Sequence, residues 1–178
     1  MAPAACQTNG ARGMLLAFCD DGLPQVAPES ERQLMNHVFS TAGCKRYRYP
    51  THTNELVYDR SAAKCSEVFL VILEPGEAPP LHVHNDTEQV FYITEGHGTL
   101  TVGKDKTQRQ FRVEPGNVVL IPPGTPHSIR SDASTRLCYV SVDCFGAAPR
   151  EEATWDEHVR VVCQMQGWDY NQIVGGKK

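Results

Sequence analysis

Hydrophobic and polar residues change their spacing twice along this chain of 178 residues. Between Leu34 and Phe39 apolar residues recur at helical spacing after a capping-box pattern at 30–33, so a short helix is predicted over 31–41. From residue 56 the pattern becomes alternating or continuously apolar, which is typical of strands. Near the C-terminus, apolar residues from Trp155 to Cys163 again share one helical face, and Gly167 is expected to end that helix.

The central part of the chain predicts several short strands separated by turns rich in Gly, Pro, Asn and Asp. The expected strands cover 56–59, 66–73, 81–84, 88–94, 99–103, 109–113, 118–121, 126–130 and 136–144. Short strands at this spacing indicate an all-β sandwich or barrel rather than a parallel α/β sheet. We therefore expect an N-terminal arm with a short helix (1–50), a β-barrel (51–146) and a C-terminal helix and tail (147–178).

Composition narrows the possible partners. The formal net charge is -4 with no long basic run, which argues against nucleic-acid binding and against binding to an acidic membrane surface. No apolar run reaches the roughly 18 residues that a membrane-spanning helix needs. The 7 cysteines are odd in number and scattered, so we expect mostly reduced thiols and a cytoplasmic protein.

Candidate metal ligands lie in two segments of the predicted barrel. His82 and His84 are two residues apart in an apolar, strand-like stretch, so both imidazoles project from one face. Gln89 follows five residues after His84, and His127 comes directly after a stiff turn rich in Pro and Gly. Three imidazoles and one amide oxygen form a plausible shell for one divalent ion on a β scaffold.

The register of the strand at 88–94 is left open by its periodicity. If Gln89 points inward, Phe91 and Ile93 do so as well and form an apolar wall. If Glu88 points inward instead, Val90 and Tyr92 line the interior. Both faces of this strand are largely apolar, so Glu88 remains the alternative ligand to Gln89.

These two segments resemble the two motifs of the cupin superfamily. The first motif corresponds to Gly76, His82, His84, Gln89 and Gly96, and the second to Gly116, Pro122, Gly124 and His127. Nineteen residues separate the two motifs, and the resemblance covers roughly residues 66–145. Two positions depart from the family pattern. Gln89 stands where the family most often has Glu, and Ser131 stands where the second motif often ends in Asn.

The resemblance implies a cupin-type antiparallel β-barrel or jelly roll with flanking N- and C-terminal helices, pairing as a homodimer. It implies one divalent ion at the barrel mouth, and the ligands it implies are His82, His84, Gln89 and His127, with Glu88 as the fallback for Gln89. The donor set suits Mn, Fe, Co, Ni or Zn without choosing among them. Phe91 and Ile93 are expected to line an apolar substrate pocket above the ion.

The neutral ligand set bears on the reaction. Three imidazoles and an amide leave the ion its full charge, which favours Lewis-acid isomerase or lyase chemistry on a small keto, carboxylate or sugar-acid substrate. The alternatives are an Fe(II)-dependent dioxygenase and a non-catalytic metal- or sugar-binding protein. Tyr139 and Asp143 are candidates for a general acid or base, against the alternative of outer-face packing or a turn cap. His52, in a turn or loop, is given no functional role.

Overall fold

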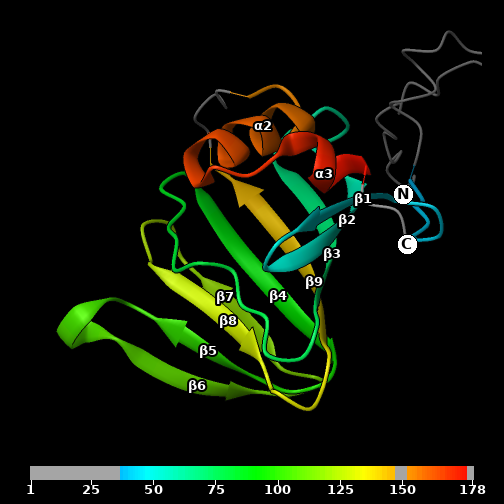
Figure 1. Cartoon of the computed structure of the whole chain (residues 1–178). Helices are drawn as coiled ribbons and strands as arrows, with labels where there is room; N and C mark the ends of the chain where they lie inside the picture. The colour runs from blue at the N-terminus through cyan, green and yellow to red at the C-terminus, as the bar shows by residue number, and fades with distance from the viewer. Residues whose placement is uncertain (1–36, 147–151, 176–178) are drawn as a thin grey trace, which may run out of the picture.

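Two antiparallel β-sheets face each other in this chain, and two helices lie across one end of them (Figure 1). The computed structural model describes residues 37–146 and 152–175. The strands are β1 Lys45–Tyr49, β2 His52–Tyr58, β3 Ser66–Leu73, β4 Thr87–Glu95, β5 Gly98–Val102, β6 Arg109–Val113, β7 Val118–Ile121, β8 His127–Ser131 and β9 Leu137–Phe145. The helices are the 3-10 turn η1 Asp105–Thr107, α2 Trp155–Gln166 and α3 Tyr170–Gly175.

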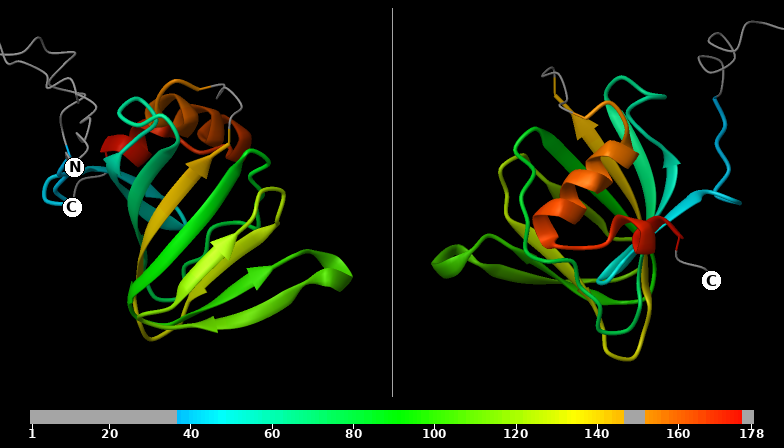
Figure 2. Two further views of the ribbon diagram at one scale, coloured as in Figure 1. Left: turned by 180° about the vertical axis from the view of Figure 1, so that it is seen from behind. Right: turned by 45° about the horizontal axis from the view of Figure 1, so that its top comes forward.

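The larger sheet has the strand order β1-β2-β3-β9-β4-β7, and the smaller sheet has the order β6-β5-β8. Sequence neighbours are often separated in this order, because β9 inserts between β3 and β4. Within the described residues the two sheets do not close into a continuous barrel, so the expected all-β fold is an open jelly-roll sandwich. Figure 2 shows the β5–β6 hairpin extending away from the large sheet.

Strict alternation along the strands places one face of each sheet in the core. In β9, every second residue from Leu137 to Phe145 is buried, and β3 shows the same pattern from Glu67 to Leu73. The inner face of β9 therefore carries Tyr139, Ser141 and Asp143 toward the interior, between apolar residues at both ends. Buried polar groups on an inner face need hydrogen-bond partners or a function. The inner face of β9 is therefore a candidate location for a functional site.

The C-terminal helix is confirmed in its position and its buried face. The Thr154 side chain accepts a hydrogen bond from the backbone N–H of Glu157, and Gly167 ends the helix in the left-handed conformation with φ 70°. Helix α2 buries Trp155, Val159 and Cys163. The Trp155 ring lies 4.3 Å from the ring of Phe69 on β3, so the helix is fixed against the large sheet (Figure 2, right).

The predictions for the N-terminal part of the chain can be compared with the structure only from residue 37 onward. Most of the helix expected over 31–41 lies outside the described residues, as do the arm at 1–27 and residues 176–178. Residues 37–41, which are described, are not helical, because the chain there approaches the turn at Gly43 that leads into β1. Strand β1 also starts before residue 51, where the barrel was expected to begin. It buries Tyr47 and Tyr49, while its basic residues lie toward solvent.

One further difference concerns the segment before β4. The expected strand at 81–84 is a single bridge between His82 and His127 rather than a strand. The described cysteines are free thiols, namely Cys44, Cys65, Cys138, Cys144 and Cys163. Among the helices of the described ranges, none has the length and apolar character needed to cross a membrane.

Candidate metal centre

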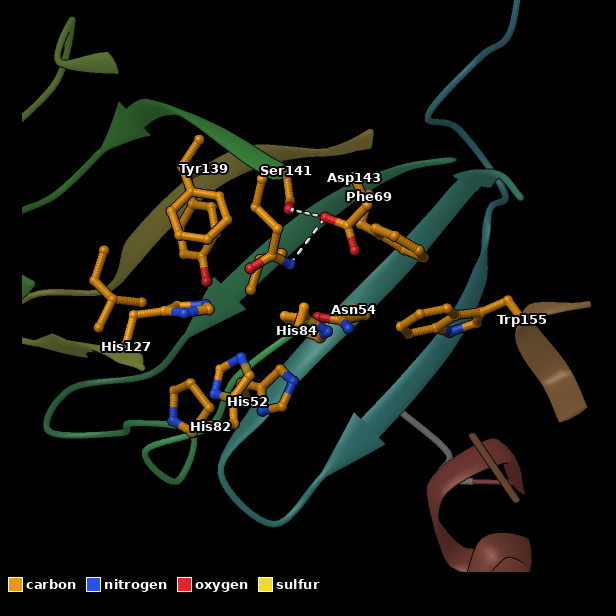
Figure 3. Close-up of a pocket in the computed structure, with 15 residues that line it drawn as sticks. His52, Asn54, Phe69, His82, His84, His127, Tyr139, Ser141, Asp143 and Trp155 are labelled. Carbon is orange, nitrogen blue, oxygen red and sulfur yellow. Dashed lines mark hydrogen bonds between the residues drawn. The ribbon is translucent and has the colours of Figure 1, made fainter. Parts of the chain in front are cut away.

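Three histidines from two distant segments meet at one point of the sandwich (Figure 3). His82 and His84 lie between β3 and β4, and His127 is the first residue of β8. Their ligating nitrogen atoms all lie within 4.8 Å of one another. The backbone holds them there, because His82 and His127 exchange two hydrogen bonds of 3.1 and 2.9 Å, and the backbone N–H of Gly124 donates to the His84 carbonyl at 2.7 Å.

The hydrogen bonds of the imidazoles determine which nitrogen is available. The Nδ1 atom of His82 lies 2.8 Å from the Pro80 carbonyl, and the Nδ1 atom of His127 lies 2.9 Å from the Thr125 carbonyl. A carbonyl only accepts, so both Nδ1 atoms carry the proton and both Nε2 atoms present a lone pair. The His127 Nε2 atom is buried and has no hydrogen-bond partner among the described residues.

Gln89 supplies a second unpartnered acceptor at the same place. The structure places Gln89 on the inner face of β4, 7% exposed, whereas Glu88 lies on the outer, exposed face. The Gln89 Nε2 atom donates to Asp143 Oδ1 at 3.0 Å. Within the described chain, its Oε1 atom is buried without a partner. The same Asp143 oxygen accepts a hydrogen bond of 3.0 Å from the Ser141 hydroxyl.

The hydrogen bond to Asp143 fixes which end of the Gln89 amide is left unpaired. A carboxylate accepts and does not donate, so Asp143 selects the NH2 end of the amide and leaves the oxygen free. Asp143 stands directly opposite Gln89 in the β4–β9 register. The residues therefore fit a divalent ion, because lone pairs from imidazole nitrogen and from an amide oxygen are left unpaired in one buried place.

The protonation state of the histidines agrees with this fit. Burial, reinforced by the neighbouring imidazoles, lowers the pKa of His84 to about 3. The same causes lower the pKa of His127 to about 4, and burial also lowers the pKa of His82. All three imidazoles are therefore neutral near pH 7, which is the form that binds a metal ion.

An inner cavity of about 110 Å³ opens beside these side chains. Phe91 lines it, whereas Ile93 is fully buried in the core and is not among the described residues that line the cavity. Tyr139 and Asp143 both line the cavity from β9, on the same inner face. Burial raises the pKa of Tyr139, so its hydroxyl group stays protonated.

The lining residues that were not expected from the sequence include His52, Asn54 and Trp155. The His52 ring stacks on Tyr49 with 4.6 Å between ring centroids, and burial lowers the pKa of His52 to about 3. His52 and Asn54 are two residues apart, the same spacing as His82 and His84. This two-residue spacing is visible in the sequence. It was not used, because the predicted strand began only at residue 56, which placed His52 and Asn54 in a loop.

Residues 69–143 match the family model described as the cupin domain. Quercetin 2,3-dioxygenase of Bacillus subtilis is 35% identical over 122 residues, which make up 67% of this chain and 33% of the dioxygenase. An uncharacterized protein of Methanocaldococcus jannaschii is 38% identical over 66 residues, which make up 37% of this chain and 50% of that protein. The chain thus spans half the length of the archaeal relative and a third of the length of the dioxygenase.

Solved structures resemble this one in fold. A predicted oxalate decarboxylase from Thermotoga maritima superimposes with a TM-score of 0.54 at 19% identity, covering 61% of this chain and 99% of that chain. A Klebsiella pneumoniae protein with a double-stranded β-helix domain superimposes with a TM-score of 0.53 at 19% identity, covering 64% and 93% of the two chains. At this identity the likeness establishes the double-stranded β-helix architecture.

Proposed function

We propose that this chain, which matches the cupin family model over residues 69–143, is a metal-dependent enzyme acting on a small oxygenated molecule. The ion would be held by the Nε2 atoms of His82 and His127, by His84 and by the Oε1 atom of Gln89. One observation carries the proposal: two buried acceptors, on His127 and Gln89, lie unpaired within the described residues. An unpaired buried acceptor costs about 1–3 kcal/mol, a cost that a bound cation would remove.

The proposed ligands are all neutral, and this favours one class of chemistry. A divalent ion held by them would keep its charge and act as a Lewis acid on a substrate carbonyl or carboxylate oxygen, as in isomerase or lyase reactions. Tyr139 lines the same cavity and keeps its proton, so it is placed to donate a hydrogen bond or a proton to substrate. Asp143 is engaged by Gln89 and Ser141, which gives it a positioning role.

The second candidate is an Fe(II)-dependent dioxygenase. It is favoured by the similarity to the Bacillus subtilis quercetin 2,3-dioxygenase, which extends over 67% of this chain. The apolar wall that Phe91 contributes to the cavity suits this chemistry as well, because it limits the access of water. The two candidates share the metal centre and differ in whether the reaction consumes O2.

Metal analysis tests the centre itself. The protein purified without chelator is expected to hold about one divalent ion per chain, and His82→Ala is expected to lower its affinity at least tenfold. His97→Ala is the matched control, because it also removes an imidazole but lies outside the cluster. If His82→Ala retains the metal content of the wild type, the proposed centre is refuted.

Metal exchange then separates the two reaction classes. Turnover supported by Zn(II) in the absence of O2 is expected for a Lewis-acid isomerase or lyase, because neither reaction changes the oxidation state of the ion. Strict dependence on Fe(II) and O2 would instead establish the dioxygenase.

A further inference from the structure

The inner cavity continues into a larger outer chamber. This chamber has a volume of about 300 Å³ and lies between the histidine cluster and helix α2. The inner cavity and the outer chamber share five lining residues: His52, Asn54, His82, His84 and Trp155. A ligand in the outer chamber therefore has direct access to the candidate metal centre.

The lining of the outer chamber is mainly aromatic and aliphatic. Tyr49, Trp155 and Trp168 contribute rings, and Val162 and Met165 contribute aliphatic surface from α2. The Tyr49 ring lies 5.7 Å from the Trp168 ring and stacks on His52 with an angle of 17° between the planes. Flat ring faces beside aliphatic groups favour a flat, hydrophobic occupant.

Two buried polar atoms at the junction of the cavity and the chamber have no partner within the residues that the structure describes. They are Asn54 Oδ1, an acceptor, and Trp155 Nε1, whose N–H is a donor, and both residues are only 8% exposed. Figure 3 shows Trp155 on the side of the pocket opposite His127, with Asn54 between them in this view. A hydroxyl group both donates and accepts hydrogen bonds, so a ligand hydroxyl can pair with either atom.

We propose that the outer chamber binds the ring of the substrate, and that the substrate is a hydroxylated aromatic compound whose oxygen-bearing edge reaches the metal centre. This inference rests on the proposed function for the part that concerns the metal. The chamber accounts for the ring, and the unpaired atoms of Asn54 and Trp155 account for a hydroxyl group. The unpaired acceptors of the metal centre account for the ion, to which oxygens on the edge of the substrate would bind. A compact chelator such as oxalate would leave the chamber empty.

Adjacent valines on α2 provide a matched pair of variants. Val162 lines the outer chamber, whereas Val161 is 39% exposed and does not line it. Calorimetric titration of the metal-loaded protein compares 2,3-dihydroxynaphthalene, which has a ring and adjacent oxygens, with oxalate, which has no ring. Val162→Phe is expected to weaken binding of the diol at least tenfold while its oxalate affinity and metal content stay within twofold of wild type. Val161→Phe is expected to change neither.

A second chamber variant tests the same prediction in case Val162→Phe does not fold. Met165 lines the chamber but is 77% exposed, so Met165→Trp narrows the opening without entering the core. It is also expected to weaken diol binding at least fivefold. The inference is overturned if both chamber variants bind the diol like Val161→Phe, or if diol and oxalate affinities fall together.

The hydroxyl pairing and the chamber can be tested apart from the metal. 2-Naphthol has one hydroxyl group and cannot chelate, so its binding reports on the chamber even if the protein proves to hold no metal. Trp155→Phe is expected to weaken 2-naphthol at least fivefold and naphthalene less than twofold, because it removes the N–H donor and keeps a ring. Equal effects on both compounds would overturn the hydroxyl assignment. Absence of metal with intact 2-naphthol binding would refute the proposed function alone.

Discussion

Exchanging the amide of Gln89 for a carboxylate should destabilise the metal-free protein, even though Glu is the commoner residue at this motif position. Gln89→Glu replaces the Nε2 donor that lies 3.0 Å from Asp143 Oδ1 with an oxygen. Both side chains are buried, at 7% and 5% exposure, so the two carboxylates would share a desolvated site. At that separation two charges repel by about 5 kcal/mol with an effective dielectric constant of about 20.

Protonation of one carboxyl group limits this cost. Holding a proton on a carboxyl group with an ordinary pKa near 4.3 costs about 1.4 kcal/mol per pH unit, so the penalty is about 4 kcal/mol at pH 7 and about 1 kcal/mol at pH 5. The pKa of the pair in the folded variant is raised above its unfolded value. Its stability is therefore retained at low pH and is lost as the pH rises toward the folded pKa.

Urea unfolding of chelator-treated protein, followed by circular dichroism at pH 5 and pH 7, measures both penalties. Glu88→Gln is the control, because it changes the neighbouring residue on the exposed face of β4 and is expected to stay within about 0.5 kcal/mol of wild type. The double variant Gln89→Glu/Asp143→Asn restores one donor and one charge, so it should recover most of the loss. A pH-independent deficit, or none at pH 7, would refute the assigned pairing.

Two further changes test the scaffold around the site. Gly96→Ala should lower the free energy of unfolding by about 3 kcal/mol or more, because a Cβ there would lie 1.7 Å from the Arg136 carbonyl oxygen. Gly116→Ala, also at positive φ but with open space among the described residues, should cost about 1 kcal/mol in the same urea assay. For Asp156, burial raises the pKa, but hydrogen bonds from Lys45 and Tyr170 outweigh it and lower the pKa to about 2. Its stabilisation is present above the ordinary pKa and is lost as the pH falls through the folded pKa of about 2, so unfolding of Asp156→Asn should be about 1 kcal/mol easier than wild type at pH 7, and the difference should vanish only near pH 1.

The positions of strands could be predicted from the sequence wherever one face of the strand is buried and turn residues flank its ends. The strands at 66–73, 109–113 and 118–121 have the bounds that the pattern predicts. Strand β1 was missed because its tyrosines alternate with basic residues that are typical of an exposed loop. Its outer residues are paired instead, since Arg48 forms hydrogen bonds with Glu77 of 2.6 and 3.1 Å.

The segment at 81–84 shows the opposite error. Its apolar and imidazole residues alternate like a strand, but Pro79 and Pro80 lack the N–H groups that would continue a ladder before it. Only the bridge from His82 to His127 forms. That single bridge is enough to bring the two histidines together, so the motif spacing identified the cluster even though the secondary structure was wrong.

The orientation of Gln89 shows why part of the site lies beyond sequence reasoning. Periodicity within β4 cannot decide between Gln89 and Glu88, because apolar residues flank both faces. The choice follows from the pairing of β4 with β9, which sets Asp143 opposite Gln89 across 54 positions of sequence. Neither residue alone indicates that the amide oxygen of Gln89 is left unpaired.

Gln89 and Asp143 are therefore better understood as one unit. An amide at position 89 can satisfy the carboxylate with its NH2 group and still present an oxygen toward the histidines, whereas a carboxylate at position 89 needs a donor opposite it. The neutrality of the proposed ligand set thus depends on a residue that is not itself a proposed ligand. On this reasoning, Gln at position 89 requires an acceptor at position 143, and Glu at position 89 requires a donor there, which the double variant tests directly.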